Sequence, residues 1–211
     1  MKNIISFSVW GDDKKYIDGA LKNVYLANKY YPDWIVRFYC QENMPSEYIS
    51  ELQNSGCEIR PKQFYRDSWF GLYWRFCPMY DDADINRFIV RDTDARISPR
   101  EVDAVNEWIE SEKPFHIMRD NQAHNVPILG GMWGSFPNIV PDFELKLKTW
   151  MHNVPGDDKN PRGRFHNTDQ EFLWKYVWPV IKDNHIAHGT KYNGNEKPFR
   201  VNNPDGYKVG T

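Results

Sequence analysis

Two carboxylates, Asp92 and Asp94, stand one residue apart directly behind the apolar run 88–90. A short buried strand that ends in such a pair can aim both side chains at one divalent cation, at the sheet edge where open α/β sheets bind ligands. Oxygen ligands suit Mg²⁺ or Mn²⁺, and a cation held by two carboxylates keeps free positions for nucleotide phosphates. Such triplets also occur in solvated turns and helix caps, so the triplet alone does not establish a metal site and the rest of the chain must be considered.

An alternation of strands and helices surrounds the pair. Apolar runs predict strands at 4–9, 35–39 and 57–60 before the strand that ends at Asp92. Cap and stop residues predict helices at about 13–30, 45–55, 69–80 and 98–112. This order is typical of an α/β fold with a mainly parallel central sheet, flanked on both faces by helices.

The second half of the chain changes character. We expect strands at 115–118 and 126–133, which would form a small second sheet, and helices at about 142–151 and 169–180. Gly130 and Gly131 break the second of these strands, either as a simple bulge or to let the backbone approach a ligand closely. After Asp183 we expect no regular structure, only a loop that folds over a ligand or a linker.

Composition excludes several classes of protein. The chain has 211 residues, 40% of them hydrophobic and 16% aromatic, which is enough for one sizeable core. A net charge of −2 with scattered basic residues argues against nucleic acid or an anionic membrane as a partner. No apolar stretch approaches the roughly 20 residues of a membrane span. Three cysteines without paired spacing fit a reducing compartment, and we expect a cytoplasmic protein.

Six features occur in a specific order along the chain: an amino-terminal nucleotide-binding half, Asp92-Thr93-Asp94, Gly130-Gly131, Asp169-Gln170, His188-Gly189 and Lys197-Pro198-Phe199. In this order the chain resembles GT-A glycosyltransferases, most closely the small enzymes of large algal viruses, and its motif order is similar to that of glycosyltransferase family 8. The resemblance implies one GT-A domain over 1–211, with a nucleotide-binding half at 1–97 and an acceptor half with a carboxyl-terminal loop at 98–211. It also implies a monomer, or one domain of a longer protein, in the host cytoplasm if the source is viral.

The resemblance further implies a metal site for Mn²⁺ or Mg²⁺. Asp92 and Asp94 match the metal motif of the family, and His188 matches its late histidine, which completes the site. A neutral imidazole is a suitable ligand for Mn²⁺. His185 is a rival for this third position, and a surface or structural role is the ordinary alternative for either histidine.

A UDP-sugar is the donor that the resemblance implies. Lys197 matches the lysine that reaches the diphosphate in family 8, although Phe199 stands where that family has tryptophan. Arg75 precedes Asp92 where the family carries a basic residue that meets the donor, and its alternative is a solvated helix-face charge. The other expected donor contacts are Ser8, Val9, Asp12 and Tyr16 for the nucleoside, and Gly130 and Gly131 for the sugar.

Two carboxylates are candidates for the catalytic base. Asp169 matches the start of the helix beneath the acceptor site of the family, but it is also a natural helix cap. Asp120 is the other candidate. An inverting enzyme would use one of them to deprotonate the acceptor hydroxyl. A retaining enzyme, as in family 8, requires no strong base, because the leaving phosphate itself can accept the proton.

The resulting hypothesis is a transferase that moves a hexosyl or deoxyhexosyl unit, of the glucose or rhamnose type, from a UDP-sugar to a glycan hydroxyl. Among the tryptophans, Trp133 is the candidate for stacking on a sugar. A phosphatase of the haloacid-dehalogenase type also uses Asp-x-Asp after a strand. It places that motif on its first strand, however, and has Thr or Val where this chain has Arg96. A non-catalytic sugar-binding module is the third possibility.

Overall fold

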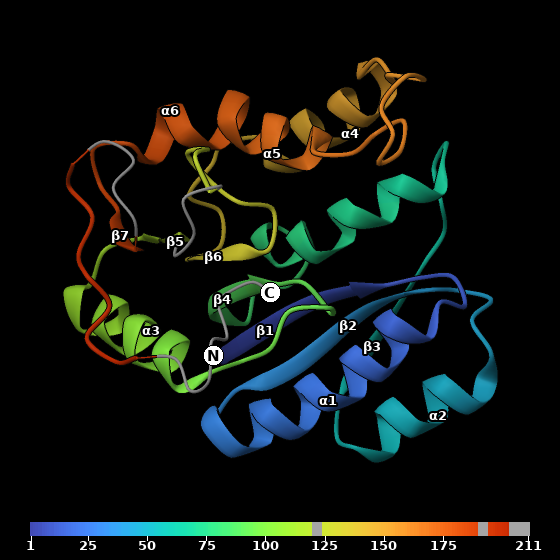
Figure 1. Cartoon of the computed structure of the whole chain (residues 1–211), viewed down its shortest axis with the longest axis horizontal. Coiled ribbons are helices and arrows are strands. Elements are labelled where there is room, and N and C mark those ends of the chain that lie inside the picture. Colours follow the sequence, from blue (N-terminus) through green and yellow to red (C-terminus); the bar gives the residue numbers. More distant parts are fainter. Residues whose placement is uncertain (120–123, 190–193, 203–211) are drawn as a thin grey trace.

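The computed structural model describes residues 1–119, 124–189 and 194–202. Its strands are β1 (Lys2–Val9), β2 (Ile35–Gln41), β3 (Glu58–Lys62), β4 (Ile85–Arg91), β5 (Phe115–Arg119), β6 (Met132–Ser135) and β7 (Ile186–Gly189). Its helices are α1 (Lys14–Tyr30), α2 (Ser46–Asn54), the 3₁₀ helix η1 (Ser68–Met79), α3 (Pro99–Ser111), α4 (Phe143–Asn153), α5 (Thr168–Phe172), the π-helical turn η2 (Leu173–Val177) and α6 (Trp178–Ile181). Figure 1 shows their arrangement.

The described strands form one seven-stranded sheet in the order β3-β2-β1-β4-β6-β5-β7. Strand β6 runs antiparallel to β4 and β5, and the other neighbouring strands are parallel. Helices α1, α2 and α3 cover one face, and α4, α5 and α6 cover the other (Figure 1). The expected fold class, a mainly parallel sheet flanked by helices, is confirmed. The expected small second sheet is absent from the described ranges, because the strands of the second half join the same sheet.

Strand β1 shows how the sequence positions helix η1. Ile5, Phe7 and Val9 alternate with polar residues and pack into the core beneath α1. On the opposite face, the hydroxyl of Ser6 donates to the Arg75 carbonyl, and the hydroxyl of Ser8 accepts from the Arg75 amide, both at 2.8 Å. Because both backbone groups of Arg75 are held by β1, its side chain starts from a fixed point above the sheet.

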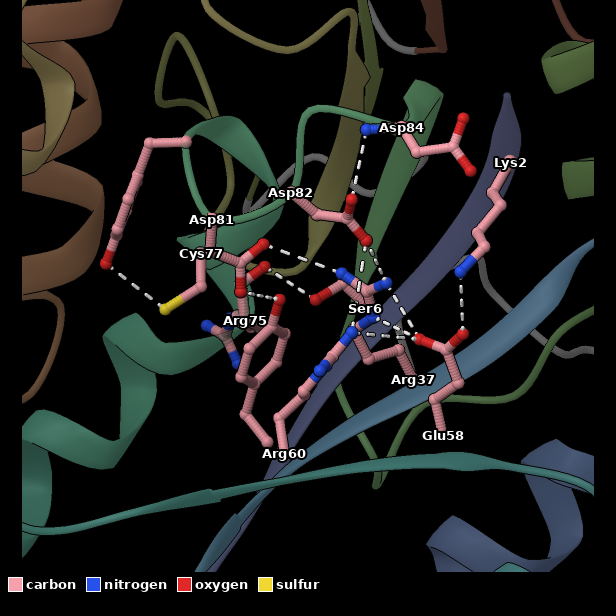
Figure 2. Close-up of polar contacts among 12 residues, drawn as sticks. Lys2, Ser6, Arg37, Glu58, Arg60, Arg75, Cys77, Asp81, Asp82 and Asp84 are labelled. Carbon is pink, nitrogen blue, oxygen red and sulfur yellow. Dashed lines mark hydrogen bonds and ion pairs between the residues drawn. The ribbon is translucent and has the colours of Figure 1, made fainter.

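A buried ion network ties β2 and β3 to the turn that precedes β4 (Figure 2). The side chain of Arg37 is fully buried and bonds to Glu58 and Asp82 at 2.7 and 2.9 Å. The hydroxyl of Tyr39 donates to Asp81 at 2.6 Å. Glu58 begins β3, and Asp81 and Asp82 precede β4, so these carboxylates lie at the sheet edge opposite the residues that follow Val9 and Arg91. They fix the point at which β4 begins.

Two expectations for the second half of the chain are wrong in detail. Residues 126–131 are irregular and only Met132–Ser135 pairs as a strand, so the two glycines precede β6. Strand β7 pairs in parallel with β5, although the Gly- and Asn-rich composition of this segment predicted no strand. Along the described ranges no helix combines the length and apolarity that a bilayer crossing requires. All three cysteines are free.

Candidate functional site

A cleft of about 900 Å³ opens at the carboxyl edge of the sheet. Strands β1, β2 and β4 are parallel, so the residues that follow them meet at this edge, and antiparallel β6 begins there. The structure thus brings most of the residues expected from the sequence to one place. Those that line the cleft are Ser8, Val9, Asp12, Tyr16, Arg75, Asp92, Asp94, Gly130, Gly131 and Asp169.

Arg75 is shared between two carboxylates at the base of the cleft. Its guanidinium donates through Nη1 to Asp92 and through Nη2 to Asp169, the latter at 2.8 Å. The side chains of Arg75 and Asp169 are 6% and 5% exposed, whereas that of Asp92 is 33% exposed. The second oxygen of Asp169 accepts from the Gln170 amide at 2.9 Å. Arg75 therefore links the end of β4 to the start of α5.

Gly130 and Gly131 make room for these two carboxylates. A Cβ atom on Gly131 would overlap the Asp92 carboxylate, and one on Gly130 would overlap that of Asp169. The close backbone approach that the glycines permit is therefore to Asp92 and Asp169. A β-carbon at either position would push one carboxylate away from Arg75.

Asp94 has a different partner, Lys15. The ammonium Nζ of Lys15 lies 2.7 Å from Asp94 Oδ2, and the two side chains are 60% and 34% exposed. The hydrogen bond to Asp94 raises the pKa of Lys15. Lys15 lies in the first turn of α1, where its amide donates to the cap residue Asp13 at 2.9 Å. Sequence reasoning missed Lys15; the only available signal was its place in the first turn after β1.

The cleft carries an excess of negative charge. Burial raises the pKa of Asp92, the charges of Asp94 and Asp169 act in the same direction, and Arg75 opposes them. The ionised form of Asp92 is therefore only partly compensated, and a further cation nearby would stabilise it. Among the described residues, five carboxylates and two guanidinium groups line the cleft: Asp12, Asp13, Asp92, Asp94 and Asp169, with Arg75 and Arg162.

Asp92 and Asp94 could hold a divalent cation. Both are partly exposed to the cleft, and carboxylate oxygens are the donors that Mg²⁺ and Mn²⁺ prefer. Within the described ranges no group of three His, Cys, Asp or Glu side chains converges as a metal site. A cation on this pair would therefore keep positions for water or a ligand.

His188 does not join the pair. Its strand, β7, is the third strand from β4, about 14 Å away at the usual strand spacing. The imidazole is buried and bonds His116 at 2.9 Å and Glu107 at 3.1 Å, and burial lowers its pKa. Lys197 bonds the same Glu107 and pairs with His188 in a β-bridge. The structure thus places both residues against α3 and away from the cleft.

The remaining residues that the sequence suggested for the site lie in three places: in the core, in the cleft, or outside the described residues. His185 bonds the Ile181 carbonyl at 3.1 Å and is not among the cleft residues. Trp133 is fully buried and stacks on Phe115, so it is a core residue and the expectation of a sugar contact is wrong. Trp10, which sequence reasoning missed, and Trp69 line the cleft instead. Asp120 lies outside the described residues.

No protein-family model and no curated protein matches the chain. Among the solved structures that resemble it are two glycosyltransferases. One is a glycosyltransferase involved in the glycosylation of the major capsid of PBCV-1, at 13% identity and a TM-score of 0.52, covering 90% of this chain and 82% of that one. The other is the apo form of the glycosyltransferase GlyE from Streptococcus pneumoniae TIGR4, at 16% identity and a TM-score of 0.50. The match covers 89% of this chain and 45% of GlyE. The likeness shows the fold, which is of the GT-A type.

Proposed function

We propose that the protein is a metal-dependent glycosyltransferase that moves a hexosyl or deoxyhexosyl unit, of the glucose or rhamnose type, from a UDP-sugar to a glycan hydroxyl. The observation that carries the proposal is the pair Asp92 and Asp94, which opens into a large cleft at the carboxyl edge of the sheet. Ligands of open α/β sheets bind at this edge. The shared fold with two glycosyltransferases, one of them involved in the glycosylation of the major capsid of PBCV-1, supports the reaction class.

Asp92 and Asp94 would hold Mn²⁺ or Mg²⁺. When bound, the cation supplies Lewis-acid stabilisation of the charge that develops on a leaving diphosphate. The negative excess in the cleft supports this proposal, because an anionic donor meets repulsion from the carboxylates unless a cation offsets them. Arg75, paired on both sides, is assigned as a positioning residue that holds Asp92 and Asp169 apart and in place.

The nucleoside would bind at the carboxyl end of β1. Ser8 is already engaged with the Arg75 amide, which leaves the backbone around Val9 and the side chains of Asp12 and Tyr16 for the base and ribose. Tyr16 is 38% exposed, and an exposed aromatic ring offers a stacking surface. This assignment keeps the donor next to Asp92 and Asp94.

Calorimetric titration tests the proposal. The purified chain is titrated with UDP-glucose, UDP-rhamnose, GDP-mannose and UDP, first with Mn²⁺ and then with EDTA. We expect binding of the UDP compounds that requires Mn²⁺ and is lost in Asp94→Ala. The matched control is Asp84→Ala, which removes an exposed carboxylate that sits before β4, at the opposite edge.

Three outcomes would contradict the proposal. Absence of nucleotide binding under either condition removes the donor site. Release of phosphate from many phosphate esters without nucleotide preference supports the phosphatase. Sugar binding without any metal-dependent consumption of a nucleotide sugar supports the binding module.

A further inference from the structure

Lys15 is a cationic side chain to which the proposed reaction assigns no role. It reaches from α1 to Asp94, and the neighbouring residues Asp13 and Tyr16 line the cleft. The lysine expected at the diphosphate, Lys197, is held by Glu107 on α3 instead. In the described part of the chain, Lys15 is thus the lysine that touches the Asp92–Asp94 pair.

The position of Lys15 is not explained by the stability of α1. The amino end of a helix carries a partial positive charge, which favours acidic residues and disfavours basic ones in the first turn. Helix α1 nevertheless begins with Lys14 and Lys15 and has no acidic residue in that turn. The two lysines there offset the charges of Asp12 and Asp13, which line the cleft beside them.

The ion pair of Lys15 with Asp94 is easily exchanged. The Lys15 side chain is 60% exposed, and pairs of this kind contribute little because water and salt screen them. Asp92, by contrast, is held by Arg75, whose side chain is 6% exposed. If a divalent cation binds the pair, the contact that gives way is therefore the one at Asp94. The flexible four-carbon stem of Lys15 then leaves its ammonium free to bind another anion nearby.

We infer that Lys15 is an exchangeable cation: it neutralises Asp94 until a divalent cation binds there, and it then binds the diphosphate of the donor. Lys15 would take the place that the resemblance to family 8 implies for Lys197. The inference rests on the proposed function and deepens it, since it assigns a diphosphate ligand on α1.

Two titrations of Lys15→Met test the two halves of the inference. With MnCl₂ alone, the variant should bind about two- to fivefold more tightly than the wild type, because a competitor for Asp94 is removed. With saturating Mn²⁺, its affinity for UDP should fall about tenfold, since a charge-assisted bond is lost. Its affinity for uridine should not change. Lys15→Arg should restore most of the UDP affinity.

Lys14→Met is the matched control, because it removes the same charge from the same turn of α1. The control should leave all three affinities within about twofold, as expected for an exposed charge that makes no direct contact. If the wild type binds UDP with Mn²⁺ and Lys15→Met matches Lys14→Met in every titration, the assignment of Lys15 is overturned and the transferase proposal stands. If the wild type binds no UDP, the transferase proposal fails and the inference fails with it.

Discussion

Arg75 forms the structural link between the two halves of the cleft. Its guanidinium contacts Asp92 at the end of β4 and Asp169 at the start of α5, and its backbone is held by Ser6 and Ser8. Both oxygens of Asp169 already accept hydrogen bonds, one from Arg75 and one from the Gln170 amide. This arrangement favours a positioning role for Asp169 over that of a general base.

Two substitutions of Asp169 separate these roles. Asp169→Asn keeps an oxygen for Arg75, so we expect turnover of the UDP-sugar to fall only about tenfold, the loss expected when a charged bond becomes neutral. Asp169→Ala leaves Arg75 with an unpaired buried donor, so the loss should reach about 100-fold. Initial rates of UDP release measure both. If Asp169 were the base, Asn would be as inactive as Ala, with losses of about 1,000-fold or more in both.

At the scale of elements, the first half of the chain was predictable because its signals are local. The run before Asp92, the cap at Asp13 and the Ser98-Pro99 start of α3 each depend on a few neighbouring residues, and each is confirmed. Strand β7 depends on a partner, β5, that is 67 or more residues away in the sequence, and its composition resembles a loop. The metal role expected for His188 depended on the same long-range pairing.

In the cleft, too, local signals were predictable from the sequence and long-range contacts were not. The apolar run of β4 and its carboxyl end placed Asp92 and Asp94 correctly at the sheet edge. The pairing of Arg75 with Asp169 joins residues 94 positions apart, and that of Lys15 with Asp94 joins residues 79 apart. Hydrophobic periodicity carries no information about which polar residues meet across a sheet, so neither pair could be read from the sequence.

The Arg37 network predicts a large contrast between two arginines that share carboxylates. Arg37→Met should lower the free energy of unfolding by about 3–5 kcal/mol, because it leaves Glu58 and Asp82 beside a buried apolar side chain in place of their charged partner. Arg60, which is 46% exposed and approaches the same two carboxylates, is the matched control. Arg60→Met should cost about 0.5 kcal/mol. Urea unfolding measures both.

Equal losses in the two variants would contradict the account of this network. The network lies toward the amino ends of the strands, away from the cleft. The UDP affinity of folded Arg37→Met protein should therefore match that of the wild type.

At the scale of the whole molecule, two buried histidines contribute to the acid stability. Burial lowers the pKa of His116 well below its ordinary value of 6.5 and also lowers that of His188. At these two side chains the unfolded chain therefore binds more protons than the folded one below pH 6.5. The stability that the neutral imidazoles contribute is present above pH 6.5 and is lost as the pH falls toward the folded pKa values.

We expect the free energy of unfolding to fall between pH 6.5 and 5. Each neutral buried histidine contributes a slope of about 1.4 kcal/mol per pH unit. His116→Phe keeps an aromatic ring against Trp108 but cannot titrate, so it should reduce the slope by about that amount. Urea unfolding at several pH values measures the slope. An unchanged slope in this variant would show that His116 is not the titrating group.

The most direct test of the metal-dependent transferase is the release of UDP from UDP-glucose and UDP-rhamnose, with a glycan acceptor or with water in its place. We predict release that requires Mn²⁺ or Mg²⁺, stops on addition of EDTA, and is lost in Asp92→Asn and in Asp94→Asn while both variants stay folded. Release that continues with EDTA, or that persists at the wild-type rate in Asp94→Asn, would contradict the claim that these two carboxylates form the reactive centre.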